Sequence, residues 1–282
     1  MAEQVHVQVP ATTSNLAAGF DCLGCALNLH NTVTLTAAKP ARPLAGMFAD
    51  TGGDFFQAAE IDAFPYRVKV TGEVPISRGL GSSVTVRLGI LAGLNRLAGE
   101  PLGPDQLLQL LVDMEGHPDN AVPAFTGGFA VCSSRQAFNV PVKPRLKYVC
   151  LIPATNVETD ACRQVLPRKV PLGDAVLNLQ HTGLITAAFF TERYQDLAGL
   201  LRDSFHQRYR AENIPGCFDV FEAARAAGAL DAFISGSGST LIALSLKNHD
   251  AVAKAMLRAA KGNGLKARTR ILQADNRGYR VR

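Results

Sequence analysis

A glycine- and serine-rich stretch, Pro75–Ser83, restricts the fold of this sequence more than any other feature. It reads Pro-Ile-Ser-Arg-Gly-Leu-Gly-Ser-Ser and lies between a strand-like run, Tyr66–Thr71, and a long apolar run typical of a helix, Val84–Leu97. Glycines let a backbone approach a ligand closely, and the N–H groups and dipole at a helix N-terminus attract anions. The stretch therefore predicts a loop that binds phosphate. Its alternative is a glycine-rich turn that only begins a buried helix.

The spacing of this stretch differs from two well-known nucleotide-binding patterns. No Gly-Lys-Ser or Gly-Lys-Thr closes it, as a Walker loop requires, and it lacks the Gly-x-Gly-x-x-Gly of dinucleotide-binding folds. The pattern therefore indicates a phosphate site of another kind. Its expected anion-binding part is a run of consecutive residues: Gly79, Leu80, Gly81, Ser82 and Ser83.

The composition is that of a globular chain. The 282 residues are 47% hydrophobic, which is enough to bury the core of one large or two moderate domains. No apolar run approaches the ~20 residues that a membrane span needs, and the N-terminus lacks the basic and then apolar layout of a secretory signal. We therefore expect a cytoplasmic protein without a membrane partner.

The charge of the chain favours small anionic ligands over nucleic acid. The net charge is +5, which suits anionic substrates but is too weak and dispersed for a nucleic-acid-binding surface. The segment Lys261–Arg282 carries seven Lys or Arg residues and one acidic residue. A solvated edge strand explains this segment more simply than an RNA contact.

Six cysteines are present, and two of them, Cys22 and Cys25, form a C-x-x-C pattern. A zinc site would need a second close cysteine pair or a histidine pair, and no such pair has the required spacing. Zinc or redox chemistry stays an alternative for this pattern. Buried thiols in a reducing compartment explain the cysteines more simply.

The order of strand and helix patterns divides the chain into two parts. The first, 1–154, is rich in strands, and the second, 155–282, alternates helices and strands. Three local expectations are a strand Gln4–Val9 that ends at Pro10, a short strand Leu44–Phe48, and a helix Gln195–Arg202. Ligands of two-lobed proteins favour the cleft between the lobes.

Four polar, turn-rich stretches interrupt the apolar chain: Pro10–Asp21, Gly79–Ser83, Glu115–Asn120 and Ser235–Thr240. Together they resemble the motifs of the GHMP kinase superfamily, and within it they fit the homoserine kinases. Further stretches resemble homoserine kinase signatures: Thr159–Pro167, His206–Arg210 and Asp275–Gly278. The resemblance implies an α+β, two-lobed GHMP kinase fold with a ribosomal-protein-S5-domain-2-like N-terminal lobe and a ferredoxin-like α+β C-terminal lobe.

This resemblance implies that the chain transfers a phosphoryl group from ATP to the side-chain hydroxyl of L-homoserine, a step toward threonine. Such an enzyme must hold a polyphosphate, neutralise it with a cation and place a hydroxyl in line with the γ-phosphorus. Mg²⁺ prefers hard oxygen ligands, and by resemblance Ser83 and Glu115 would supply them. The phosphate loop would bind the phosphates of ATP.

The resemblance also implies a site for an amino acid, which needs a cationic group for its carboxylate. Arg163 and Arg210 resemble the carboxylate-binding arginines of the family. The other positions expected to line the substrate site are Asn15, Asp21, His117, Asp119, Asn120 and Gly238. Asn120 is the candidate to touch the reacting hydroxyl. We assign no general base, because phosphoryl transfer through a loose transition state needs little base assistance.

Several residues depart from the family pattern. Val84 follows the loop where small residues are usual, and a β-branched residue there is expected to crowd the first helical turn. The segment Asp50–Pro65, with Asp54–Ala59 as the remnant of a helix, is short for an adenine pocket. His206 either packs near Arg210 or caps a helix.

These departures leave two alternatives to homoserine phosphorylation. One is a GHMP kinase for another small hydroxy acid, and the other is a non-catalytic member of the fold that binds a ligand. The fold is also compatible with a homodimer.

Overall fold

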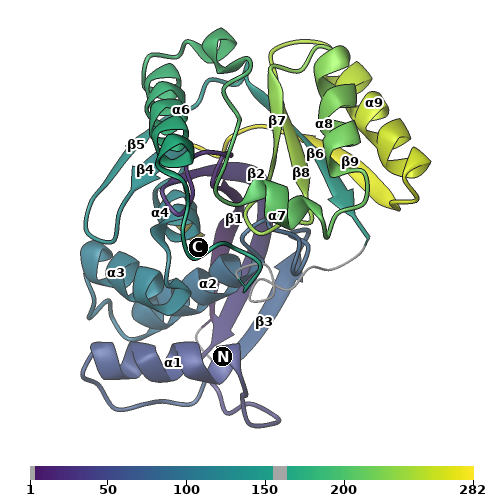
Figure 1. Cartoon of the computed structure of the whole chain (residues 1–282). Coiled ribbons are helices and arrows are strands. Elements are labelled where there is room, and N and C mark those ends of the chain that lie inside the picture. The colour runs from purple at the N-terminus through teal and green to yellow at the C-terminus, as the bar shows by residue number, and fades with distance from the viewer. Residues whose placement is uncertain (1–3, 155–163) are drawn as a thin grey trace.

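Two antiparallel sheets form the frame of the molecule (Figure 1). The structure is a computed structural model that describes residues 4–154 and 164–282. The strands of the first sheet are β1 (Gln4–Ser14), β2 (Leu23–Thr36), β3 (Arg67–Gly72), β4 (Phe129–Cys132), β5 (Ala137–Val140) and β10 (Arg280–Val281). Those of the second sheet are β6 (Lys147–Pro153), β7 (Asp231–Ile234), β8 (Leu241–Ser245) and β9 (Ala267–Leu272).

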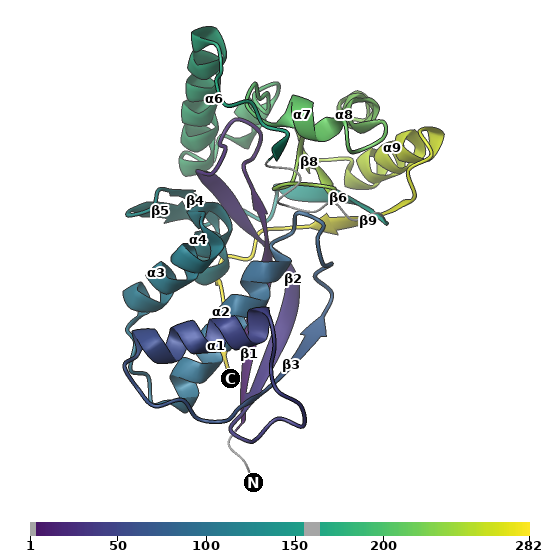
Figure 2. The ribbon, with the colours of Figure 1, turned by 60° about the horizontal axis from the view of Figure 1, so that its bottom comes forward.

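The helices pack against these sheets. They are α1 (Met47–Ala58), α2 (Ser82–Leu97), α3 (Pro104–Glu115), α4 (Pro118–Thr126), α6 (Leu172–Phe190), α7 (Gln207–Ala211), α8 (Cys217–Ala226) and α9 (His249–Gly262), with a 3₁₀ helix, η1, over Tyr194–Leu197. Helices α1 to α4 gather on the first sheet, and α8 and α9 lie beside the second (Figure 2). Within the described ranges, no helix combines the length and the apolar character needed to cross a bilayer.

The strand order confirms the predicted two-lobed α+β fold. The first sheet runs β10-β1-β2-β4-β5, with β3 also paired to β2. The second sheet runs β7-β8-β6-β9 in space, while the chain visits β6, helices, β7, β8, α9 and β9 in turn. That βαββαβ path is the ferredoxin-like arrangement expected of the C-terminal lobe.

Each of the two sheets contains one strand that comes from the other part of the chain. Strand β6 lies before the division predicted at 154/155, yet it pairs with β8 and β9 of the second sheet. Strand β10, near the C-terminus, returns to the first sheet and pairs with β1. The sheets therefore change over between β5 and β6, and the division of the chain into 1–154 and 155–282 stays a prediction.

Helix α2 lies in close contact with β2, and this contact fixes where the helix begins. A Cβ added at Gly89 would overlap Val33, and one at Gly93 would overlap Leu35. A buried hydrogen bond also joins the strand to the helix, because Asn31 Nδ2 donates to Thr85 Oγ1 at 2.9 Å. Because α2 cannot shift on the sheet, its N-terminus, where the glycine-rich stretch ends, has a fixed position.

A shared hydrophobic core joins the two lobes. Phe129 of β4 stacks on Phe189 of α6, with ring centroids 4.0 Å apart and an interplanar angle of 5°. Tyr148 of β6 is fully buried in the same cluster, and its hydroxyl donates to Cys25 Sγ at 3.0 Å. The lobes are therefore held together by packed side chains as well as by loops.

Several local expectations need correction. Strand β1 does not end at Pro10 but continues to Ser14, because a register shift between Pro10 and Ala11 accommodates the proline. The expected strand Leu44–Phe48 is wrong, since α1 begins at Met47. The expected helix Gln195–Arg202 is reduced to the short η1. The remnant Asp54–Ala59 belongs almost entirely to α1, so the segment forms a longer helix than expected.

Candidate active site

The glycine-rich stretch forms a loop that is fixed from both lobes. Gly79 and Gly81 adopt φ values of +70° and +66°, a left-handed backbone that favours glycine. Gly81 is the N-cap of α2, and a Cβ there would overlap Thr12 Oγ1 of β1. A Cβ at Gly79 would overlap the Ser235 carbonyl oxygen, which belongs to the second lobe. The loop N–H groups at the start of α2 are thus suited to an anion.

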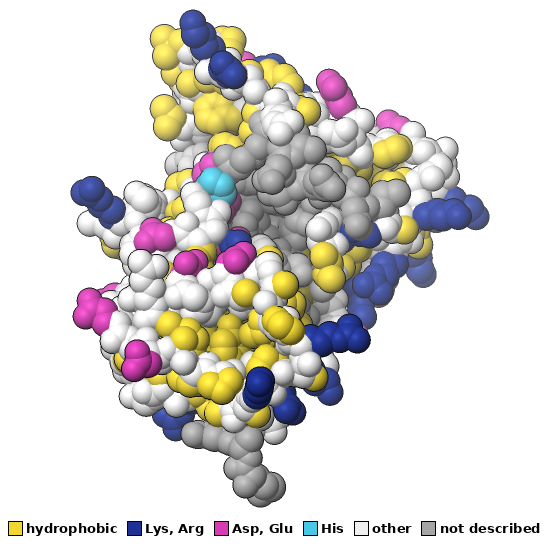
Figure 3. Space-filling model, turned by 90° about the horizontal axis from the view of Figure 1, so that it is seen from below, with side chains coloured by type: hydrophobic (Ala, Val, Ile, Leu, Met, Phe, Trp, Pro, Cys, Tyr) yellow, Lys and Arg dark blue, Asp and Glu magenta, His cyan; other side chains and the backbone are white. Residues whose placement is uncertain are grey.

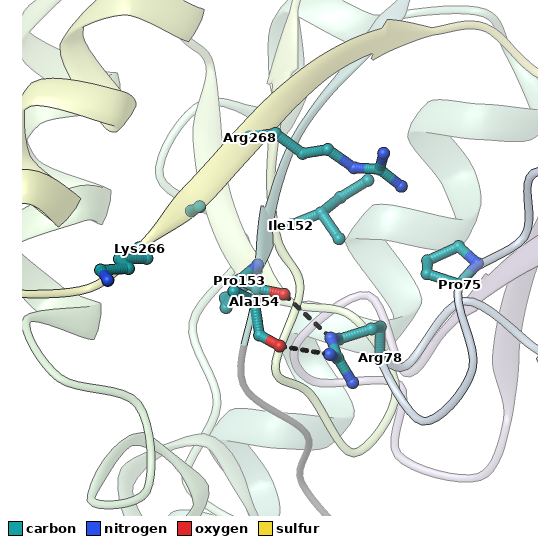
Figure 4. Close-up of a pocket in the computed structure, with 8 residues that line it drawn as sticks. Pro75, Arg78, Ile152, Pro153, Ala154, Lys266 and Arg268 are labelled. Atoms are coloured by element: carbon teal, nitrogen blue, oxygen red, sulfur yellow. Dashed lines mark hydrogen bonds between the residues drawn. The ribbon is translucent and has the colours of Figure 1, made fainter.

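Arg78 ties the start of this loop to the end of β6, as Figure 4 shows. Its Nε donates to the Pro153 carbonyl oxygen at 2.9 Å, and its Nη2 donates to the Ala154 carbonyl oxygen. A cavity of about 400 Å³ lies beside it, lined by Pro75, Arg78, Ile152, Pro153, Ala154, Lys266, Ala267 and Arg268. Because the guanidinium bonds carbonyls of the second sheet, the position of the loop depends on both lobes.

Ser83 and Glu115 meet where α2 begins and α3 ends. Ser83 Oγ donates to Glu115 Oε2 at 3.1 Å, although the two residues lie 32 positions apart. Two neighbouring ligands of an octahedral Mg²⁺ lie about 3.0 Å apart, because each Mg–O distance is about 2.1 Å. The spacing of the hydroxyl and carboxylate oxygens therefore fits a magnesium ion beside the glycine-rich loop. The other carboxylate oxygen, Oε1, accepts from Arg87 Nη1 at 2.7 Å.

Asn120 lies in the first turn of α4 and is held by β1. Its Oδ1 accepts from Thr12 Oγ1 at 2.7 Å, and its Nδ2 donates to Ser14 Oγ at 3.0 Å. The neighbouring Asp119 is 3% exposed, and its carbonyl oxygen would overlap a Cβ at Gly24. The side chain of Asn120 is therefore fixed beside the glycine-rich loop, which also contacts Thr12.

The loop after β1 carries Asn15 and Asp21. Asn15 has φ +70°, donates from Nδ2 to the Gly236 carbonyl oxygen at 3.1 Å and accepts from the Asp21 backbone N–H at 3.0 Å. Asp21 Oδ2 lies 3.8 Å from His117 Nδ1, and the two side chains are 32% and 37% exposed. Asn15 thus shapes the loop, while Asp21 and His117 face each other at an accessible surface.

Arg210 of α7 reaches the same junction from the second lobe. Its Nη1 donates to the Gly236 carbonyl oxygen at 2.8 Å and to His206 Nδ1 at 3.2 Å. The pKa of His206 is lowered to about 4, mainly by burial and in part by Arg210, while Asp203 opposes the change. Of the two expectations for His206, packing near Arg210 is confirmed. His206 is the N-cap residue of α7, but its side chain makes no cap hydrogen bond.

Hydrogen bonds connect all four polar stretches into one site. The first stretch bonds the third through Thr12 and Asn120, and it bonds the fourth through Asn15 and Gly236. The Thr12 backbone N–H donates to the Leu80 carbonyl oxygen of the glycine-rich loop at 3.2 Å. Gly238 lies in the fourth stretch with φ +92°. Arg163, the second candidate carboxylate ligand, lies outside the described residues.

The expected crowding by Val84 does not occur. Its side chain is 1% exposed and belongs to the hydrophobic cluster between α2 and the first sheet. The β-branched carbons therefore point into the core and leave the loop open.

Four residues that hold the site were not singled out from the sequence: Thr12, Ser14, Arg87 and Ser235. Ser235 Oγ donates to the Gly79 carbonyl oxygen at 2.5 Å, and the same oxygen lies 2.8 Å from the hydroxyl of Thr13. Only Arg87 had a usable signal, because it follows Ser83 by four residues and therefore lies on the same face of a helix. Thr12 and Ser14 meet Asn120 from more than 100 positions away in the sequence, and Ser235 meets Gly79 across the lobes, so no local pattern reveals these contacts.

The cysteines are free thiols in the described chain: Cys22, Cys25, Cys132, Cys150 and Cys217. Within residues 4–154 and 164–282, no group of three or more His, Cys, Asp or Glu side chains is arranged to hold a metal ion. Burial raises the pKa of Cys25 to about 12, so its thiol stays protonated at neutral pH. The interpretation of Cys25 as a buried thiol is confirmed.

Known proteins resemble this chain over its whole length. Residues 47–128 match the N terminal domain of the GHMP kinases, and residues 185–264 match the family described as GHMP kinases C terminal. Homoserine kinase from Microchaete diplosiphon is 39% identical over 298 residues, covering 99% of this chain and 97% of the relative. Homoserine kinase from Clostridium botulinum is 32% identical and covers 97% of both chains.

Solved structures share the fold. The crystal structure of homoserine kinase from Cytophaga hutchinsonii has a TM-score of 0.90 at 24% identity, covering 100% of this chain and 98% of that chain. The mevalonate kinase of Methanococcus jannaschii has a TM-score of 0.72 at 13% identity, covering 98% and 99%. Two matched domains and full-length relatives above 30% identity lead to one conclusion: the chain belongs to the homoserine kinase family of the GHMP kinases.

Proposed function

We propose that this chain transfers the γ-phosphoryl group of ATP to the side-chain hydroxyl of L-homoserine, giving O-phospho-L-homoserine and ADP on the route to threonine. The observation that carries the proposal is the full-length identity of 39% to a protein named homoserine kinase. The connected site supports it, because the glycine-rich loop, Glu115, Asn120 and Arg210 serve the separate tasks of one phosphoryl transfer.

The phosphate end of the site acts by position and charge. The loop Gly79–Ser83 presents N–H groups at the N-terminus of α2, where the helix dipole favours a polyphosphate. Ser83 and Glu115 would hold Mg²⁺, which when bound neutralises charge on the phosphates. Because the glycine loop is fixed by Thr12 and Ser235, its donors are oriented before the nucleotide arrives.

The acceptor end of the site orients the hydroxyl. Asn120 is fixed by two hydroxyl groups, so its amide is aligned before substrate binds. It is the candidate to hold the homoserine hydroxyl in line with the γ-phosphorus. Such positioning, together with stabilisation of charge, supplies most of the rate acceleration in phosphoryl transfer. The partly exposed side chains of Asp21 and His117 are candidates to bind the ammonium group of the substrate.

Arg210 is the candidate ligand for the substrate carboxylate among the described residues. It is 3% exposed and lies within 5.3 Å of the Phe20 ring centroid, so its position is restricted on several sides. A guanidinium with a fixed plane binds a carboxylate selectively. We therefore expect alcohols without a carboxylate to be poor substrates.

One assay tests the proposal. Purified protein is incubated with ATP, Mg²⁺ and L-homoserine, and ADP release is measured while each component is omitted in turn. Release that requires all three supports the proposal. Release only with another hydroxy acid would change the substrate, and no release from folded protein that binds nucleotide would support a non-catalytic member of the fold.

We also propose a homodimer formed through α6. This helix carries uncharged apolar side chains on its outer face, with exposed fractions of 80% for Leu172, 42% for Val176 and 72% for Leu179. Their spacing of four and three residues places them on one stripe. Helix α6 stands out from the body in Figure 2, and apolar side chains gather on the matching projection in Figure 3.

An exposed apolar helix face without charges is stabilised when another apolar face covers it. In a symmetric dimer the same face of a second copy would do so, and we therefore propose a second copy of this chain as the partner. Light scattering after size-exclusion chromatography would give the dimer mass for the native chain and the monomer mass for Leu179→Glu.

The free thiols of the described residues support a reducing, cytoplasmic compartment.

A further inference from the structure

Arg87 binds the carboxylate that is proposed to hold the metal. It lies on α2, four residues after Ser83, and therefore on the same helix face. Its Nη1 donates to Glu115 Oε1 at 2.7 Å and to the Met114 carbonyl oxygen at 2.7 Å. Both distances are short, as expected of hydrogen bonds from a charged donor.

The two oxygens of Glu115 consequently have separate partners. Oε2 accepts from Ser83 Oγ at 3.1 Å, and Oε1 accepts from Arg87. The side chains of Arg87 and Glu115 are 26% and 13% exposed, so water competes weakly for either group. The second bond of Arg87, to the backbone of Met114, stops the guanidinium from following the carboxylate if it turns.

This arrangement bears on the choice of metal. Mg²⁺ takes oxygen ligands at about 2.1 Å in a strict octahedron and usually binds one oxygen of a carboxylate. Ca²⁺ is larger, accepts six to eight oxygens and readily takes both oxygens of one glutamate. A glutamate with one oxygen held by a guanidinium suits the first ion better than the second, because a Ca²⁺ that took both oxygens would have to share Oε1 with Arg87.

We propose that Arg87 is a positioning residue that restricts Glu115 to one oxygen and thereby makes the site select Mg²⁺ over Ca²⁺. The inference rests on the proposed function, in which Glu115 is a metal ligand. It goes beyond that function because it assigns metal selectivity to a residue that does not touch the metal. A merely structural role for Arg87 would affect stability and would leave the preference between the two ions unchanged.

Direct binding tests the inference without turnover. Calorimetry gives the dissociation constants of the Mg²⁺ and the Ca²⁺ complexes of a non-hydrolysable ATP analogue for the native chain and for Arg87→Met. Removing the guanidinium frees Oε1, and we expect the selectivity, the ratio of the Ca²⁺ to the Mg²⁺ constant, to fall on the order of tenfold. Arg87→Gln, which keeps a donor for Met114, is a second variant in case Arg87→Met does not fold.

The matched control is Arg96→Met on the same helix, where Arg96 pairs with Glu100 and both side chains are more than half exposed. Its selectivity is expected to equal that of the native chain. An unchanged selectivity in both Arg87 variants, with Glu115→Gln weakening the binding of both complexes, overturns the inference and leaves the proposed metal ligand intact. If Glu115→Gln leaves both constants unchanged, the metal role of Glu115 fails, and the inference fails with it.

Discussion

His206 Nδ1 accepts a hydrogen bond from Arg210 Nη1 at 3.2 Å, while its Nε2 lies 2.9 Å from the Ala17 carbonyl oxygen. A guanidinium can only donate, and a carbonyl oxygen can only accept. The imidazole is therefore neutral, with its proton on Nε2. In this form His206 links the loop after β1 to the candidate carboxylate ligand.

Stability should fall in mild acid because of this histidine. Burial lowers the pKa of His206 from about 6.5 in the unfolded chain to about 4. Between these values the unfolded chain binds the extra proton and the folded chain does not, so the free energy of unfolding decreases as pH falls from 6.5 to 4. Urea unfolding across this range measures the slope. His206→Asn should flatten it, and an equal slope in the variant would contradict the assignment.

Asn120→Ala should lower kcat by roughly 100-fold, because the amide that orients the acceptor hydroxyl is lost. The KM for ATP should stay close to the native value, since the glycine-rich loop proposed to bind the phosphates is untouched. Steady-state kinetics with each substrate varied separate the two parameters. Thr12→Val removes one support of Asn120 and should give a smaller loss; a larger loss would show that Thr12 acts on the substrate itself.

Gly81→Ala should raise the KM for ATP about tenfold, since a Cβ would both strain the left-handed backbone and push against Thr12. The matched control is Gly99→Ala, where φ is +81° and an added Cβ meets no atom within 4 Å. That variant should lose ~1 kcal/mol of stability and keep its kinetics. If both variants changed the KM for ATP equally, backbone strain alone, and not the overlap with Thr12 of β1, would explain the effect of Gly81→Ala.

Phe189→Ala should cost about 3–5 kcal/mol of unfolding free energy, because it removes a fully buried ring that stacks on Phe129 between the lobes. Phe218→Ala is the comparison, since that ring is 52% exposed and its removal should cost well under half as much. Guanidinium unfolding monitored by circular dichroism gives both values. Similar losses would show that the interlobe stack adds nothing.

Local patterns in the sequence predict those parts of the site that are local. The two glycines of the glycine-rich loop precede α2, its two serines begin that helix, and the apolar run after them continues it. The position of Ser83 opposite Glu115 follows from the family resemblance, and the structure places their oxygens 3.1 Å apart. The roles of both residues stay predictions that the variants above can test.

Contacts between distant segments could not be predicted in this way. Pro10 normally ends a strand, but the register shift that carries β1 past it depends on the pairing with His30 and Leu27 of β2. The five-residue helix that presents Arg210 is too short for a periodic pattern, and three backbone N–H groups bonded to Asp203 hold its start. Tertiary structure decides these features, so they have no local signature.

The return of β10 to β1 has a consequence for how the molecule is made. Arg282 and His6 exchange two backbone hydrogen bonds at 2.8 and 3.0 Å, and Val281 pairs with Val7. Until residues 280–282 leave the ribosome, β1 is an open edge of the first sheet, which could pair with another chain. A variant without residues 280–282 would leave Val7 and Gln8 as an open edge, on the same strand that carries Thr12 and Ser14.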